Sequence, residues 1–184
     1  ASTIPFKTIG VRLTSEIYLE SHGFLRNSNA LRVQYGLLPN WSVYLTAASS
    51  NHHKKTLPTD YPYHNTPERG VYKPYEFNGF SLYAKYRFAS WDSEKQHLRM
   101  AIYGEASTVN SAHDEGEPRL MDDTKGFGGG LITTFLYQKF ATSITVGGIF
   151  PGEFVGEQKD VVSTLPNIPT RVAYPNAMQY SLSF

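Results

Sequence analysis

The sequence contains no cysteine, which excludes disulfide-bonded scaffolds and cysteine-based zinc sites. No apolar run approaches the roughly 18 residues of a membrane-spanning helix, and no segment keeps the apolar spacing of an amphipathic helix over three turns. The formal net charge is only +1, without blocks of like charge, so nucleic acid is not an expected partner. The start, ASTIPFKTIG, has neither the basic end nor the apolar run of a signal peptide. The protein is therefore cytoplasmic or a mature exported form.

Aromatic residues and glycine are abundant instead, with 13 Tyr, 11 Phe, 2 Trp and 15 Gly among 184 residues. Apolar and polar residues alternate in eight segments, a pattern typical of β-strands with two different faces. These segments span about residues 9–22, 29–38, 41–49, 77–89, 97–108, 126–137, 140–150 and 171–184. No linker divides the chain, so we expect one all-β domain over residues 1–184.

The two faces of these segments differ in charge. The apolar faces contain no charged residue, and their main members are Leu13, Ile17, Leu31, Val33, Val43, Leu45, Leu82, Met100, Ile102, Leu131, Ile144, Val146, Met178 and Leu182. The opposite faces contain Arg12, Glu16, Glu20, Arg32, Lys85, Arg87, Arg99 and Glu105. A soluble β-sandwich would turn its polar face to water, whereas a membrane barrel would turn its apolar face to lipid and its polar face to a lumen.

The connections between the segments alternate in length. Short turns occur at Pro39-Asn40, around Trp91 and at Gln138-Lys139, whereas long polar loops cover residues 50–76, 109–125 and 151–170. All short turns therefore fall at one end of the sheet. Outer-membrane barrels have this asymmetry, with short periplasmic turns and long external loops. We expect both chain ends to lie on the periplasmic side.

Aromatic residues concentrate near the predicted strand ends. Those near the short turns are Tyr35, Trp41, Phe88, Trp91, Tyr137, Phe140 and Phe184, and those near the long loops are Phe24, Phe77, Phe127, Phe150 and Tyr174. Amphipathic rings favour the two interfaces of a membrane, and barrels carry a girdle at each. Together with the alternation and the loop asymmetry, this predicts an antiparallel up-and-down transmembrane β-barrel in the outer membrane of a Gram-negative bacterium.

Several stretches carry a resemblance to known proteins. The last strand alternates Met178, Tyr180, Leu182 and Phe184, which resembles the C-terminal signature of bacterial outer-membrane barrels. The stretches RVQYGLLPNWSVYL, FNGFSLYAKYRF, HLRMAIYGEAS and TKGFGGGLITTFL resemble a family of uncharacterised outer-membrane β-barrel proteins of Bacteroidota, described only as candidate transporters. In that family the match to YSLSF is usually followed by further strands, which implies ten to twelve strands. The eight segments found here would also close a barrel.

Candidate chemical groups are sparse and fall mostly in loops. His52-His53-Lys54-Lys55 could bind a metal or lipopolysaccharide phosphates, and the acidic residues of AHDEGEPRLMDD could bind Ca²⁺, but solvated loops are the favoured interpretation of both. His22, His97 and His113 are weak candidates for catalysis. GFGGG is followed by no helix, so it is not a phosphate loop. We predict no catalytic residue, cofactor or metal.

The expected function is therefore a porin-like transporter or channel, or an accessory subunit of an envelope complex, in contact with membrane lipid, lipopolysaccharide and other outer-membrane proteins. Two alternatives stay open. One is an outer-membrane lipid-modifying enzyme similar to lipid A deacylases. The other is a soluble lipocalin-like binding barrel, in which Arg12, Arg32 and Arg99 would face bulk water. The charged face could line a pore with mild anion preference or form ion pairs that fill an eight-stranded barrel.

Overall fold

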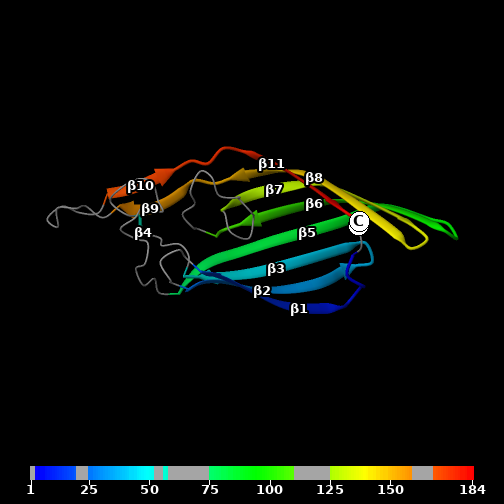
Figure 1. Ribbon diagram of the computed structural model, residues 1–184, viewed down its shortest axis with the longest axis horizontal. Coiled ribbons are helices and arrows are strands. Elements are labelled where there is room, and N and C mark those ends of the chain that lie inside the picture. The colour runs from blue at the N-terminus through cyan, green and yellow to red at the C-terminus, as the bar shows by residue number, and fades with distance from the viewer. Residues whose placement is uncertain (1–2, 20–24, 52–55, 58–74, 110–124, 159–167) are drawn as a thin grey trace.

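The computed structural model describes residues 3–19, 25–51, 56–57, 75–109, 125–158 and 168–184. Eight antiparallel strands follow one another up and down in a single sheet (Figure 1). In spatial order they are β1 (Ile9–Leu19), β2 (Leu25–Leu38), β3 (Trp41–Ser50), β5 (Glu76–Asp92), β6 (Gln96–Ser107), β7 (Gly126–Tyr137), β8 (Phe140–Pro151) and β11 (Ala177–Ser183). The predicted all-β class and up-and-down strand order are confirmed. No helix among the described residues is long and apolar enough to cross a membrane.

The sheet is open in this structure rather than closed into a barrel. β1 pairs with β2 and β11 pairs with β8, and these two strands form the edges of the sheet. The predicted closure is therefore not a feature of the structure, because each edge strand has its ladder on one side only. The pairing of β11 covers seven residues, from Ala177 to Ser183.

The sheet is nevertheless curled toward one side. Residues of β2 and β11 line one cavity of about 490 Å³, together with residues of the strands between them. Those two strands are six positions apart in the strand order. In a flat sheet they would lie roughly 29 Å apart, so the sheet must curl for both to line one cavity. The side that holds this cavity is the concave face, and the other side is the convex face.

Glycines in β7 and β8 make room for one tyrosine on the concave face. Tyr103 in β6 lies directly opposite Gly130, and Gly130 lies opposite Gly147. A Cβ at Gly130 would come within 2.9 Å of Cε1 of Tyr103, and one at Gly147 within 3.2 Å of its Cζ. The Tyr103 ring therefore lies across both glycines, and its hydroxyl accepts a hydrogen bond from Gln179 in β11. This side chain links β6 to the edge strand.

The short turns lie at one end of the sheet, as the sequence predicts. The turn after β2 is tied to β5, because Arg87 N donates to Asn40 O at 2.8 Å. Similarly, Gln138 N donates to Lys95 O at 2.9 Å, which joins two neighbouring turns. The N-terminal segment reaches the same end, where Ile4 N donates to the buried Ser42 hydroxyl at 2.8 Å.

A small second sheet changes the predicted third loop. β9 (Phe154–Gln158) pairs antiparallel with β10 (Ile168–Val172) and parallel with β4 (Thr56–Leu57), so residues 151–170 and 50–76 are not loop throughout. The predicted final strand over residues 171–184 is also interrupted, between β10 and β11. Pro175 lies in this gap, and proline cannot donate to a strand ladder.

The strand boundaries otherwise depart little from the predictions. The structure gives β7 the predicted range, while β5 continues to Asp92, beyond the predicted end at residue 89. The turn around Trp91 is therefore only residues 93–95. β2 begins at Leu25, earlier than the predicted start at residue 29.

The glycine arrangement makes a stability prediction. We expect Gly147→Ala to lower the free energy of unfolding by roughly 1–3 kcal/mol, because the added methyl group overpacks against Tyr103 and against the carbonyl oxygen of Gly129, 2.7 Å away. Gly148→Ala is the matched control, because a Cβ there makes only ordinary contacts, the nearest at 3.5 Å from Phe150. Urea unfolding of the two variants measures the difference. Equal stabilities would show that Tyr103 does not need the glycine at residue 147.

Candidate functional site

The convex face is apolar and largely exposed across the whole sheet. Cross-strand register places Val33, Leu45 and Leu82 side by side, and each is between 40 % and 48 % exposed. Of the fourteen apolar residues predicted for this face, twelve are exposed, whereas Val43 and Met100 are partly buried. The buried apolar residues, by contrast, are few: Ala48, Ala101, Tyr103, Val109, Ile149 and Tyr174 among those described. The large apolar side chains thus point away from the molecule instead of filling a core.

Exposed aromatic rings mark both ends of the convex face. Tyr35, Phe88, Trp91, Tyr137, Phe140 and Phe184 lie exposed toward the short-turn end. Trp41, at the same end, is partly buried because it stacks on Tyr86 at 5.0 Å between ring centroids. Toward the other end, Phe150 stacks on Phe127 at 5.1 Å. Tyr174 does not join this group, because it is only 9 % exposed, and residue 24 lies outside the described residues.

The charged residues lie on the other side of the strands. Arg12 opposes Arg32, and Arg32 opposes Thr46, which lines the cavity of the concave face. The strand alternation places Glu16 on the same side as Arg12, and Arg87 on the same side as Lys85. Arg99 and Glu105 line cavities on this side, while residue 20 lies outside the described residues. The concave face is thus the charged face of the sheet.

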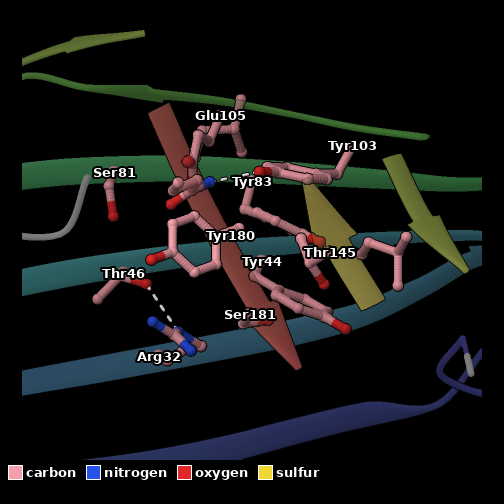
Figure 2. A pocket seen from close by; sticks show the side chains of 13 residues that line it. Arg32, Tyr44, Thr46, Ser81, Tyr83, Tyr103, Glu105, Thr145, Tyr180 and Ser181 are labelled. Carbon is pink, nitrogen blue, oxygen red and sulfur yellow. Dashed lines mark hydrogen bonds between the residues drawn. The ribbon is translucent and has the colours of Figure 1, made fainter. Parts of the chain in front are cut away.

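The cavity of about 490 Å³ forms the middle of this face, and we call it the central cavity (Figure 2). It is lined by Arg32, Tyr44, Thr46, Ser81, Leu82, Tyr83, Tyr103, Glu105, Ile132, Thr145, Gln179, Tyr180 and Ser181. Arg32 Nε donates to Thr46 Oγ1 at 3.1 Å, which holds the guanidinium against β3. Eleven of these thirteen side chains carry a hydroxyl, amide or charged group.

Three tyrosines form a stacked row in the central cavity. Tyr44 and Tyr83 oppose each other in register, and their rings stack with centroids 5.1 Å apart. Tyr83 also stacks on Tyr103 at 5.4 Å and an interplanar angle of 17°. Such pairs contribute roughly 0.5–1.5 kcal/mol each beyond their burial. This tyrosine row directs phenol groups into the cavity, as Figure 2 shows.

A second cavity of about 500 Å³ lies closer to the short turns, and we call it the turn-side cavity. It is lined by Lys85, His97, Arg99, Ile132, Thr134, Leu136, Ala141 and Ser143. Ile132 belongs to both cavities, so the two adjoin along the strands. At its rim, His97 Nδ1 is 2.6 Å from Asp92 Oδ1, and Arg99 Nη2 is 3.6 Å from the same oxygen.

The tyrosine row and Gln179 are parts of the site that were not predicted from the sequence. A signal for the row is present, since Tyr44, Tyr83 and Tyr103 occupy polar-face positions of three segments. The contact of Gln179 with Tyr103 gives no such signal, because the two residues are 76 positions apart. The loop candidates, including His52, His53, His113 and the acidic residues from Asp114 to Asp123, lie outside the described residues.

Among the described residues no group of three or more His, Cys, Asp or Glu side chains could hold a metal ion. Comparisons of this chain with protein-family models, with curated proteins and with solved structures find no match. The resemblance to outer-membrane proteins of Bacteroidota therefore stays a prediction from the sequence.

The link between Tyr103 and Gln179 makes a prediction about the edge strand. We expect Tyr103→Phe to speed amide hydrogen exchange in β11 roughly fivefold, because a neutral hydrogen bond contributes about 1 kcal/mol. Tyr137→Phe, at an exposed position near a short turn, is the control and should leave this exchange unchanged. Exchange measured by mass spectrometry compares the two. An unchanged rate in Tyr103→Phe would mean that this bond does not hold β11 in place.

Proposed function

We propose that this chain is an integral outer-membrane β-barrel protein that provides a polar path for solutes, either as a transporter or channel or as a subunit of an envelope complex. One observation carries the proposal. Large apolar side chains are exposed on the convex face of all eight strands of the sheet, whereas the concave face holds the charged and hydroxyl groups. This is the arrangement of a protein that meets lipid on its outside.

The extent of the apolar surface supports a lipid environment. Soluble monomers rarely expose contiguous apolar patches larger than a few hundred Å². Among the residues that the structure describes, 30 large hydrophobic ones are exposed, and those of neighbouring strands lie side by side. The strands are also long enough to cross a bilayer, which takes roughly 9–11 residues of a strand. From β1 to β8, apart from β4, they have 10–17 residues. β11, with 7 residues, is shorter.

The lipocalin-like alternative agrees less well with the distribution of apolar and charged side chains over the two faces. A soluble barrel that binds an apolar ligand would need apolar side chains on its concave face. The central cavity instead presents Arg32, Glu105 and three tyrosines, while Leu45 and Ile102 point outward. The same arrangement supports a water-filled or solute-binding interior.

The open edges of the sheet require further strand pairing if the protein is embedded in lipid. In hydrocarbon, unpaired backbone N–H and C=O groups cost several kcal/mol each, so a lipid-embedded sheet needs closure. β1 and β11 would pair with each other in an eight-stranded barrel, or with further strands in a wider one. A wider barrel suits a channel, because interiors of eight-stranded barrels are filled by side chains.

The enzyme alternative lacks a supporting geometry in the described residues. His97 is hydrogen-bonded to Asp92, but no described hydroxyl is hydrogen-bonded to its ring, and the Ser143 hydroxyl contacts Thr134 and the carbonyl of Thr133. A deletion strain tests this alternative through the mass spectrum of its lipid A, which we expect to be that of the wild type.

The lipid-facing role of the convex face makes the main prediction. We expect the double variant Leu31→Arg and Ile144→Arg to fail to insert into lipid vesicles, because Arg on a lipid face costs about 2–4 kcal/mol near the midplane. Insertion is measured by heat-modifiable gel mobility after refolding from urea into vesicles.

The matched control is the double variant Gln34→Arg and Thr145→Arg, which adds the same charges to the concave face of the same two strands. We expect the control to insert like the wild type. Normal insertion of the Leu31→Arg and Ile144→Arg variant would contradict the proposed membrane location.

A further inference from the structure

Lys85 is a buried cation with no carboxylate partner among the described residues. It lies in β5 on the concave face, between Ser42 of β3 and Tyr103 of β6, and is only 9 % exposed. Its ammonium group is 6.0 Å from the centre of the Tyr44 ring. No acidic side chain among the described residues forms an ion pair with Lys85. Burying a charge is costly unless it is paired, so this position calls for a negative group.

Arg99 offers a second incompletely paired cation to the same cavity. Its Nε is buried and has no hydrogen-bond partner in the described part of the chain. Its Nη2 is 3.6 Å from Asp92 Oδ1, but this oxygen is already 2.6 Å from His97 Nδ1. One carboxylate at the rim therefore pairs with two basic side chains, and no carboxylate in the described part of the chain pairs with Lys85.

The turn-side cavity gathers these groups around an empty volume of about 500 Å³. Lys85 and Arg99 line it from β5 and β6, and the hydroxyls of Thr134 and Ser143 line it from β7 and β8. The two hydroxyl oxygens are 3.0 Å apart. Guanidinium and ammonium groups donate charge-assisted hydrogen bonds to oxyanions, and hydroxyls add neutral ones. The donors of the cavity thus match a small oxyanion.

We propose that the turn-side cavity binds a small oxyanion of the phosphate or carboxylate type, with Lys85 and Arg99 as its charged ligands. As a claim about the transported solute, the proposal rests on the function proposed above. As a claim about binding, it rests only on the cavity. The adjoining central cavity, which meets the turn-side cavity at Ile132, gives the anion a polar route along the concave face.

Titration calorimetry of the folded full chain in detergent, with inorganic phosphate as titrant, tests binding. We expect the wild type to bind phosphate, and Lys85→Met and Arg99→Met each to weaken binding about tenfold or more, because a charge-assisted hydrogen bond is lost. Lys139→Met removes the same charge from an exposed turn at the same end of the sheet and should bind as the wild type. Lys85→Arg keeps the charge and should retain most of the affinity.

Acetate as a second titrant separates the two sources of oxyanion. Binding of both ligands means a general oxyanion site, and binding of one of them alone identifies phosphate or carboxylate as the ligand class. The absence of binding by both, or equal affinities in wild type, Lys85→Met and Arg99→Met, overturns the proposal. Near-ultraviolet circular dichroism verifies that each variant keeps its folded aromatic environment.

Insertion into vesicles, measured on the same preparations, separates this proposal from the proposed function. Insertion without phosphate or acetate binding overturns the anion site and leaves the membrane location in place. Binding in detergent by a protein that does not insert overturns the membrane location and leaves the site. When both hold, the ion selectivity of bilayer currents should shift toward cations in Lys85→Met but not in Lys139→Met.

Discussion

A β-strand sends alternate side chains to opposite faces, so a period of two in the sequence becomes a difference between the two sides of a sheet. In this chain the alternation runs through the eight strands of the sheet, apart from local register shifts such as the bulge after Arg87. Cross-strand register places the apolar side chains of neighbouring strands side by side. The apolar side then becomes one continuous surface without a core to cover it. The proposed membrane location rests on this surface, because hydrocarbon would cover apolar side chains that no core covers.

The shape of the concave face depends on how a few individual side chains pack. Curling brings side chains of β2 and β11 to one cavity, and bulky rings have to fit within the curve. Gly130 in β7 lies opposite Tyr103, and Gly147 in β8 lies opposite Gly130. Because glycine has no side chain, the Tyr103 ring can lie across β7 and β8, and its hydroxyl reaches Gln179. The stacked tyrosines then form a wall beside Lys85, whose ammonium group lies 6.0 Å from the centre of the Tyr44 ring. The tyrosine row of the central cavity thus lies next to Lys85, a residue of the proposed anion site in the adjoining turn-side cavity.

Much of the fold could be predicted because its signals are local. The range of β7 was predictable since its alternation ends at a two-residue turn, Gln138-Lys139, where Gln138 adopts a positive φ of 52°. β9 and β10 could not be predicted, because FVGEQ and IPTRV show too little alternation and become strands through pairing with each other. The open edges were not predictable either, since closure depends on contacts between the first and last strands of the sheet.

The parts of the candidate site also differ in whether local sequence signals predict them. Which residues share the charged face follows from period two alone, so Arg32, Lys85 and Arg99 were identified together. Register and the bulge after Arg87 decide the pairing of these cations. They leave Lys85 buried with no acidic partner among the described residues, while Arg99 shares Asp92 with His97. A one-residue change in register would move every side chain to the other face.

The most direct test of the two-faced sheet is a spin-label scan of residues 142–146 in β8, which the absence of cysteine makes simple to build. Nitroxide labels are placed one at a time in protein refolded into vesicles, and their collisions with oxygen and with a water-soluble nickel complex are measured. Our account predicts high oxygen and low nickel accessibility at Thr142, Ile144 and Val146, and the reverse at Ser143 and Thr145. Equal accessibility at all five positions, or the opposite alternation, would contradict it.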